Sequence, residues 1–313
     1  MNDFTLIVPT HNRHHYIKRS IEYFKDLDAP IIYCDSSNEH YTGVIPSNIK
    51  YLHTPNLKFA EKILHAISLI HTSKVALCAD DDFILVESLY KGDEFLNQNS
   101  NYSTVVGQYA GFNKEFDGSF FEMYKWRDLD RDVNNDVLDN AKTFFSDYHQ
   151  ILWAMYRKEV VQTAFDIIVK SEFKNDNFIE LTIGACACYN GGIKIFKDLW
   201  GVREHDSENH WASRHLPLSM ISSDKLRKDF LQFKENIDAI TIKGYADLII
   251  KSYFQDKKQK KLINKLTRIL PKPLKRYIKK NILNKQPQLI ISTKQKNNDQ
   301  FSIINEILST KFF

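Results

Sequence analysis

Glycine, proline and cysteine are scarce in this chain of 313 residues, which has only 10, 8 and 4 of them. So little glycine and proline, beside 43% hydrophobic residues, excludes a collagen-like or largely disordered chain. No run approaches the roughly 18 uninterrupted apolar residues of a membrane-spanning helix. A basic and apolar leader with a small-residue cleavage site is also lacking at the N-terminus, so we expect a cytoplasmic protein.

The four cysteines do not form the spacings that bind zinc. There is no CxxC pair, and Cys34 and Cys78 each end an apolar, strand-like run. This pattern favours reduced thiols buried in a core over a metal or redox site.

Charge is unevenly distributed along the chain. The net charge is +4, yet residues 257–285 alone carry 12 Lys or Arg and no Asp or Glu. The rest of the chain is therefore net acidic, which argues against a generally basic body that binds nucleic acid.

The first hundred residues alternate short apolar runs with segments of helical spacing. Strands are predicted at Phe4–Val8, Ile31–Cys34, Ile49–Leu52 and Val75–Cys78, and helices at His15–Phe24 and Phe59–Ile67. This alternation predicts an α/β fold with a mainly parallel central sheet and helices on both faces. Polar clusters follow the first, second and fourth strands, at the edge where such sheets bind ligands.

The later pattern is less regular. Strands are predicted at Thr104–Gly107, Ile151–Tyr156 and Ile193–Phe196, and a helix at Phe178–Tyr189. After about residue 222 the pattern becomes helical and charged. We therefore expect a main domain over residues 1–222 and a helical C-terminal appendage over 223–313.

Three consecutive carboxylates, Asp80, Asp81 and Asp82, follow the fourth predicted strand. Their mutual repulsion costs free energy unless cations or donor groups compensate it. Mg²⁺ and Mn²⁺ prefer such oxygen ligands, together with substrate phosphates. The triplet therefore predicts a divalent-metal site, with a solvated acidic turn or helix N-cap as the alternative.

Asp35 holds a similar place after the second strand. Its carboxylate could accept hydrogen bonds from a nucleobase or ribose. The sequence Asp35-Ser36-Ser37-Asn38 is also ordinary turn chemistry, so an Asx-turn is the alternative.

The order of three short motifs resembles a glycosyltransferase of the GT-A fold, family-2-like. The motifs are Val8-Pro9-Thr10-His11-Asn12-Arg13, then Asp35-Ser36-Ser37, then Ala79-Asp80-Asp81-Asp82, and the resemblance covers roughly residues 3–205. It implies the nucleotide-diphospho-sugar transferase fold, with 1–222 as the catalytic domain. It also implies a nucleotide-sugar donor and Mn²⁺ or Mg²⁺ as cofactor.

The resemblance assigns roles by position in the motifs. Pro9, Thr10 and Arg13 would border the nucleotide, and Asp35 would hold the base or ribose. Asp80 and Asp82 would be the outer residues of the DXD motif that binds metal and diphosphate, with Asp81 between them. Lys62 lies where the family often places a residue facing the nucleotide, although it could equally be a solvated lysine on a helix.

The family's catalytic carboxylate usually opens a helix that leads to a glycine and a strand. Here Glu180 is the candidate base and Asp176 the second candidate, ahead of Gly191-Gly192-Ile193. The common Glu-Asp pair is missing, because Leu181 stands in its second place. A base here would take the proton of the acceptor hydroxyl, whereas the alternative for Glu180 is an exposed helix charge.

A late histidine often completes the metal site of such enzymes. His205 fits that role, with His210 as a nearby alternative, although a lone histidine is more often a surface or packed residue. Trp153, Tyr156 and Trp211 could stack on sugar rings, but core packing is the better reading for Trp153.

The basic segment 257–285 places apolar residues at helical spacing beside a lysine-rich face. This pattern suits an anionic membrane surface, to which each nearby Lys or Arg adds about 1 kcal/mol of attraction. A solvated helical pair packed on the core and a nucleic-acid site remain alternatives, although aromatic residues are sparse there.

These observations favour a metal-dependent transferase that moves a sugar from a nucleotide-diphosphate donor, a UDP-sugar by the resemblance. The acceptor would be a glycan or a lipid-linked molecule in surface polysaccharide synthesis, reached from the inner face of the membrane. Inversion follows if Glu180 is a base. The alternatives are a nucleotidyl- or phosphosugar transferase, which would want a glycine-rich phosphate loop, and a non-catalytic membrane-associated scaffold or glycan-binding module.

Overall fold

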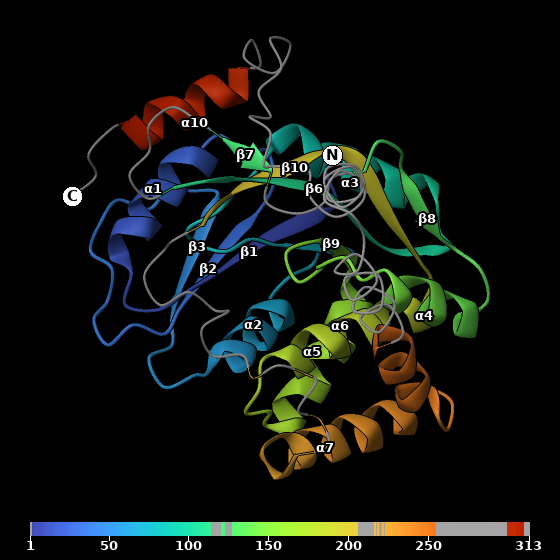
Figure 1. Ribbon diagram of the computed structural model, residues 1–313. Coiled ribbons are helices and arrows are strands. Elements are labelled where there is room, and N and C mark those ends of the chain that lie inside the picture. Colours follow the sequence, from blue (N-terminus) through green and yellow to red (C-terminus); the bar gives the residue numbers. More distant parts are fainter. Residues whose placement is uncertain are drawn as a thin grey trace, which may run out of the picture.

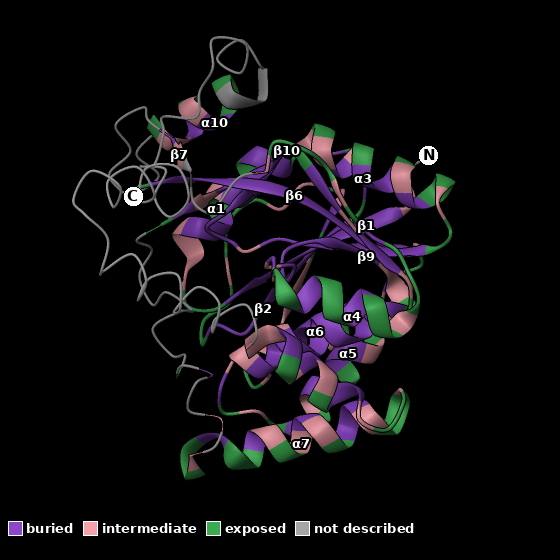
Figure 2. Cartoon of the chain, turned by 45° about the vertical axis from the view of Figure 1, so that its right-hand side comes forward, coloured by how far each residue is buried: buried purple, intermediate pink, exposed green. Residues whose placement is uncertain are grey.

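The structure is a computed structural model of the chain (Figure 1). It describes residues 2–113, 120–122, 127–205, 216, 218, 221, 223–254 and 299–309. One central sheet runs through the molecule, and helices cover both of its faces. The burial map shows strands that are buried almost throughout and helices with one buried and one exposed side (Figure 2).

The sheet has the strand order β3-β2-β1-β4-β9-β6-β10-β5, with β7 paired to β6 and β8 to β10. The strands are β1 (Phe4–Thr10), β2 (Ile31–Asp35), β3 (Ile49–His53), β4 (Lys74–Leu77), β5 (Phe83–Ile84), β6 (Tyr102–Phe112), β7 (Phe121–Glu122), β8 (Arg131–Val133), β9 (Met155–Arg157) and β10 (Gly192–Glu204).

The longest strands of this sheet all point the same way. β3, β2, β1 and β4 pair in parallel, and β6 pairs in parallel with β10. The short strand β9 lies antiparallel to both β4 and β6, so β6 and β10 run in the direction of β1 and β4. The carboxyl ends of β1, β2, β4 and β10 therefore meet at one edge of the sheet, where ligands bind in folds of this kind.

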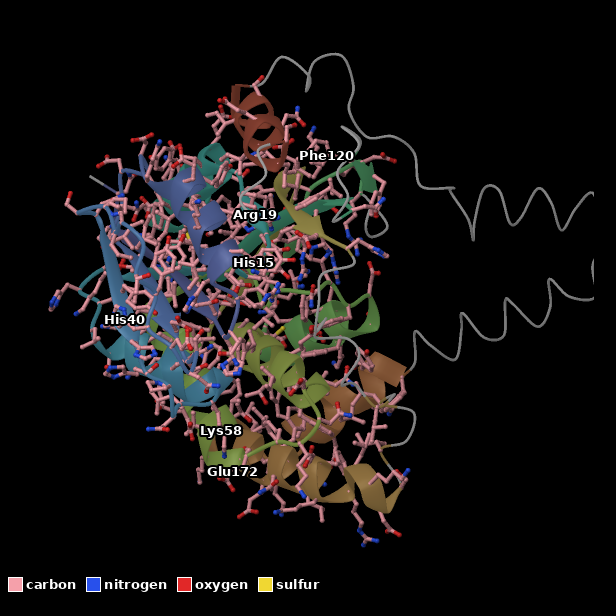
Figure 3. The ribbon with its side chains drawn as sticks, turned by 90° about the vertical axis from the view of Figure 1, so that its left-hand side faces the viewer. His15, Arg19, His40, Lys58, Phe120 and Glu172 are labelled. Atoms are coloured by element: carbon pink, nitrogen blue, oxygen red, sulfur yellow. The ribbon has the colours of Figure 1, made fainter. Side chains whose placement is uncertain are left out.

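Helices lie on both faces of the sheet (Figure 1). The first face carries α1 (His14–Phe24) and α3 (Val86–Gln98), and the second carries α2 (Phe59–Ser68), α5 (Lys158–Ser171) and α6 (Asn177–Tyr189). The helix α4 (Val137–Ser146) packs beside α6. At the surface the side chains of Lys58 and Glu172 form an exposed ion pair that joins the start of α2 to the end of α5 (Figure 3).

The helical pattern of the sequence has a direct counterpart in α1. Ile17, Ile21 and Phe24 recur at the spacing of one helix face, and all three are buried against the sheet. By contrast α6 is buried on nearly all sides, because α4, α5, α7 and the sheet all pack against it.

The described part of the chain after residue 222 packs directly on the main domain. The helix α7 (Asp224–Ile240) lies against α5 and α6, and its Phe233 and Ile237 belong to the hydrophobic core. Residues 245–254 are helical, and Tyr245 packs against Tyr189 of α6. The helix α10 (Asp299–Ser309) lies against α1. The predicted boundary at residue 222 remains a prediction. The basic segment 257–285 lies outside the described residues.

Several sequence predictions of local structure are confirmed and one is partly wrong. The first four strands, the helices over α1, α2 and α6, and a charged helix after residue 222 are all present. The predicted strand Ile151–Tyr156 is a strand only over Met155–Arg157. Residues 151–154 are buried in non-strand conformation, and burial explains their apolar character equally well. All four cysteines are free and buried, as expected.

None of the described helices is long and apolar enough to cross a lipid bilayer.

Candidate functional site

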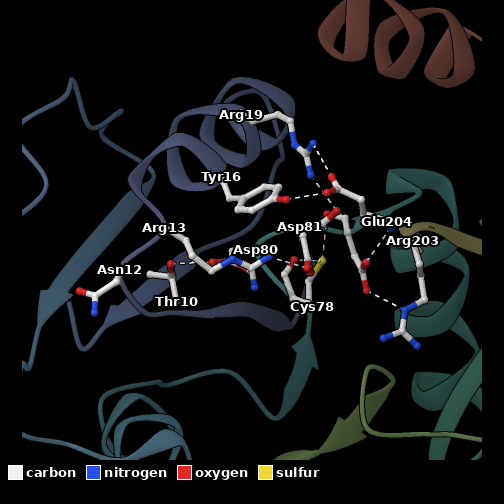
Figure 4. A network of polar contacts seen from close by, with 12 residues as sticks. Thr10, Asn12, Arg13, Tyr16, Arg19, Cys78, Asp80, Asp81, Arg203 and Glu204 are labelled. Carbon is white, nitrogen blue, oxygen red and sulfur yellow. Dashed lines mark hydrogen bonds and ion pairs between the residues drawn. The ribbon is translucent and has the colours of Figure 1, made fainter. Parts of the chain in front are cut away.

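The polar clusters predicted after three strands come together at the carboxyl edge of the sheet. Thr10 ends β1, Asp35 ends β2, and the acidic triplet follows β4. The structure adds the end of β10, where Arg203 and Glu204 face the triplet (Figure 4).

Arg13 binds two of the three triplet carboxylates. Its guanidinium lies 3.1 Å from an oxygen of Asp80 and 2.5 Å from an oxygen of Asp81 (Figure 4). The hydroxyl of Thr10 donates to the other oxygen of Asp80 at 2.7 Å. Arg13 in the loop after β1 therefore compensates the negative charge of Asp80 and Asp81.

Arg203 binds the last triplet carboxylate from the opposite side. Its Nε lies 2.8 Å from Oδ2 of Asp82, and the backbone N–H of Glu204 donates to Oδ1 of Asp82 at 3.3 Å. Asp82 is only 3% exposed. This burial raises the pKa of Asp82 to about 7 although Arg203 favours the ionised form, and burial likewise raises the pKa of Asp80.

Arg13 and a further arginine, Arg19, are held by a second set of contacts. The ring of Tyr16 lies between the guanidinium groups of Arg13 and Arg19, at 4.2 and 4.6 Å from the ring centroid. The Tyr16 hydroxyl donates to Glu204, and Arg19 donates both to Glu204 and to the backbone carbonyl of Asp81. Helix α1 is thereby tied to the ends of both β4 and β10 (Figure 4).

The backbone between β1 and α1 takes an uncommon conformation. Asn12 has φ of 53°, in the left-handed region that asparagine tolerates better than most residues. Its backbone N–H donates to the hydroxyl of Ser37, and its side chain accepts from the backbone N–H of Asn38. The loops after β1 and β2 therefore hold each other in place beside the triplet.

Lys62 lies buried behind these two loops. Its ammonium donates to the carbonyl of Thr10 and to the hydroxyl of Ser36. Burial lowers the pKa of Lys62, although nearby Asp80 and Asp35 favour its charged form. The interpretation of Lys62 as a solvated helix lysine is wrong, and the structure brings it to the candidate site.

Asp35 is fully buried and forms the Asx-turn that the sequence left open. One carboxylate oxygen accepts from the backbone N–H and hydroxyl of Ser37, and the other accepts from the hydroxyl of Tyr51 at 2.6 Å. His14 lies 3.5 Å from the same carboxylate, and its ring packs edge-on against Tyr41. Asp35 thus lies beside one tyrosine and one histidine at the predicted nucleotide edge.

Glu180 is not the exposed helix charge that the alternative supposed. It lies in the first turn of α6, partly buried, and accepts from the hydroxyl of Tyr148 at 3.2 Å and from the amide of Gln150 at 2.6 Å. The Gln150 carbonyl accepts from Arg203, so two side chains connect Glu180 to Asp82. Burial raises the pKa of Glu180 above its usual value, while both hydrogen bonds and Arg203 oppose that rise.

The remaining predicted residues have mixed outcomes. Pro9 is buried inside β1, in register with Cys34 of β2, and Asp176 is the residue at the N-terminal end of α6. His205 is exposed, and its ring packs edge-on against Phe121. The core packing of Trp153 is confirmed, and the stacking role offered for Tyr156 is wrong, because both side chains are buried. His210 and Trp211 lie outside the described residues.

The triplet has the right donor chemistry for a hard divalent cation, since its side chains offer only carboxylate oxygens. In the part of the chain that the structure describes, no three His, Cys, Asp or Glu side chains converge as a ligand set. Asp80 and Asp82 are the residues that would hold the cation, with the diphosphate of a donor supplying further oxygens. The participation of His205 remains a prediction.

Several side chains at this edge were not among the residues predicted from the sequence. Tyr16, Arg19, Gln150 and Glu204 all reach the network from elements far apart in the chain. A signal for two residues of this edge was nevertheless present in the sequence. Arg203 and Glu204 immediately precede His205, the histidine that we singled out at a strand end.

Comparison with known proteins shows similarity at the level of structure. No protein-family model and no curated protein sequence matches the chain. The crystal structure of S. aureus TarS, residues 1–349, in complex with UDP-GlcNAc matches with a TM-score of 0.55 and 13% sequence identity. The match covers 87% of this chain and 77% of that one. A second crystal structure of TarS 1–349 matches at 0.49 and 12%, covering 83% and 91%.

The first match confirms the predicted fold class. At 13% identity it shows a shared fold and no more. The chain therefore has the GT-A-type α/β fold that its three motifs indicated, with a mainly parallel sheet between helices.

Proposed function

We propose that the protein is a glycosyltransferase that takes a nucleotide-diphosphate sugar, a UDP-sugar, as donor. One observation carries this proposal: the three predicted motifs meet at one sheet edge, where a partly buried glutamate on α6 is linked to them by Gln150 and Arg203. The fold shared with TarS, whose crystal structure contains UDP-GlcNAc, supports the choice of donor.

The charges at the edge suit a nucleotide diphosphate. Arg13, Arg19 and Arg203 present guanidinium groups, which bind phosphate oxygens in pairs. Lys62 adds an ammonium beneath the loops after β1 and β2. Mn²⁺ or Mg²⁺, held by Asp80 and Asp82, would neutralise the charge that develops on the leaving diphosphate.

Glu180 is the proposed base for a direct displacement. The acceptor hydroxyl oxygen attacks the anomeric carbon while the bond from that carbon to the diphosphate oxygen breaks. The hydroxyl proton passes to the Glu180 carboxylate, and the nucleotide diphosphate leaves with the electron pair. A single displacement of this kind inverts the configuration of the sugar.

The donor proposal is tested by turnover. The full chain is incubated with Mn²⁺ and a panel of nucleotide sugars that includes UDP-GlcNAc, and hydrolysis of each donor is measured. At least one donor is expected to be consumed, and both Asp80→Ala and Asp82→Ala are expected to lose that activity. Absence of turnover across the panel argues for a non-catalytic module, and full activity in both variants contradicts the proposed role of the triplet.

We also propose that the acceptor is a glycan or lipid-linked molecule at the inner face of a membrane, where the protein docks peripherally. The support is compositional: 12 basic and no acidic residues in 257–285 are attracted to anionic lipid headgroups.

Deleting residues 257–285 is expected to release the protein from anionic membranes. The measurement is co-sedimentation with vesicles that contain phosphatidylglycerol, at low and high salt. The deletion variant should stay in the supernatant, and wild-type protein should leave the pellet as salt rises. Equal sedimentation of both proteins contradicts membrane docking by this segment.

A further inference from the structure

A continuous chain of polar contacts joins the acidic triplet to the candidate base. The Nε atom of Arg203 lies 2.8 Å from Oδ2 of Asp82, and its Nη1 donates to Oε1 of Gln150 at 2.5 Å. The Gln150 amide nitrogen then donates to Oε1 of Glu180 at 2.6 Å. The guanidinium of Arg203 thus bonds both to the acidic triplet and to the side chain that holds Glu180.

The chemistry of the three groups dictates how Gln150 is oriented. A guanidinium can only donate hydrogen bonds, and an ionised carboxylate can only accept them. A glutamine amide has one accepting end and one donating end. With Arg203 on one side, the carbonyl of Gln150 must face it, and the NH₂ group must therefore face Glu180.

We propose that Arg203 is a positioning residue that acts through Gln150 to keep Glu180 ionised and aimed as a base. Loss of the guanidinium removes the donor that holds the Gln150 carbonyl, and a Gln150 carbonyl turned toward Glu180 could bond only to a protonated Glu180. This role rests on the proposed function, because it gives Glu180 the task of a base.

The surroundings of Glu180 make this control necessary. Burial at the start of α6 raises the pKa of Glu180 and so favours the neutral carboxylic acid. Tyr148 supplies a second hydrogen bond at 3.2 Å, and Tyr253 of the helical stretch 245–254 packs edge-on against its ring. On the side of the triplet, the Gln150 amide donates a hydrogen bond to Glu180, and the positive charge of Arg203 favours the ionised form of Glu180.

The test measures the pKa of Glu180 directly in the full chain. Protein labelled with ¹³C at the glutamate side-chain carboxyl carbon is titrated by NMR, and the signal that Glu180→Gln removes is Glu180. In Gln150→Leu the pKa of Glu180 is expected to rise by about one unit, as the loss of one hydrogen bond to a carboxylate predicts. The matched control is Gln98→Leu, which removes the amide that donates to exposed Glu94 on α3.

Arg203→Lys separates positioning from charge. Lysine keeps the positive charge beside Asp82 but lacks the planar fork that holds two partners in fixed directions. The pKa of Glu180 is therefore expected to rise in this variant nearly as far as in Gln150→Leu. An unchanged pKa in Gln150→Leu, or a wild-type pKa in Arg203→Lys, overturns the proposal. Gln150→Leu replaces a partly buried side chain by one of similar size, so a folding failure of the arginine variant leaves the first comparison intact.

The outcome is separable from that of the proposed function. A raised pKa in Gln150→Leu supports the positioning role even where Glu180→Gln still consumes UDP-GlcNAc, and that result removes only the base role. Conversely, loss of turnover in Glu180→Gln together with an unchanged pKa in Gln150→Leu keeps the base and removes the positioning role.

Discussion

Glu180→Gln is expected to slow sugar transfer by about 10²- to 10⁴-fold, the usual contribution of a positioned general base. Glutamine keeps the size of the side chain and can still bond to Tyr148, but it cannot take a proton. Among the described residues, Gln150 and Arg203 are the side chains that connect Glu180 to the triplet, so the affinity for UDP should change little. The measurements are turnover of the donor identified by the panel and the Kd for UDP.

Asp176→Asn is the informative control for this assignment. Asp176 immediately precedes α6, one helical turn before Glu180, and its backbone carbonyl accepts from the backbone N–H of Glu180. Its substitution is expected to reduce turnover much less than that of Glu180. The assignment is contradicted by the reverse order, a large loss in Asp176→Asn beside a small one in Glu180→Gln.

Asp82→Asn is expected to weaken Mn²⁺-dependent binding of UDP by at least about 10- to 100-fold, the cost of disturbing even an outer contact of a metal site. Asparagine keeps the shape of the side chain but offers one weak oxygen ligand and no charge. The comparison variant is Asp128→Asn, which alters an exposed carboxylate away from the triplet. Equal loss of affinity in both variants would mean that the triplet has no special role.

The pKa of about 7 at Asp82 gives this binding a pH dependence with a defined sign. A cation binds the ionised carboxylate, so protons compete with it. The affinity of wild-type protein for UDP in the presence of Mn²⁺ should therefore fall as the pH is lowered from 8 to 6. In Asp82→Asn the group that competes for protons is absent, and the remaining weak binding should depend less on pH over that range.

The sheet edge was predictable because its signals are local. A buried strand followed at once by polar residues can be recognised within ten positions, and Thr10, Asp35 and Asp80 each stand in such a place. Parallel pairing then brings these ends together whatever the rest of the chain does. The signals for α1, α2 and α6 were equally local, because the spacing of their apolar residues or the length of the apolar run can be recognised within one short stretch of sequence.

The side chains that complete the site were not predictable in the same way. Lys62 and Glu180 look like ordinary helix charges in the sequence. Lys62 is buried and bonds to partners 26 and 52 positions away. Glu180 is partly buried, and its partners are 30 and 32 positions away. Arg203 meets Asp82 across 121 positions. Such contacts depend on tertiary packing, which no local period encodes.

The apolar run at 151–156 shows the complementary failure. A short apolar run is consistent with a buried strand or with a buried loop, and periodicity cannot separate them. Here Tyr156 lies in β9, whereas Ile151 and Leu152 precede the strand and are just as buried. Gln150, which bonds to both Glu180 and Arg203, stands directly before this segment.

Calorimetric titration of the full chain with UDP tests the central claim most directly, because it needs neither the right sugar nor an acceptor. With Mn²⁺ present, we expect saturable binding of one UDP per chain, lost when the cation is chelated and strongly weakened in Asp82→Asn. The claim that this sheet edge binds a nucleotide diphosphate through the acidic triplet would be contradicted by an absence of binding, or by equal Kd values for wild-type protein and Asp82→Asn.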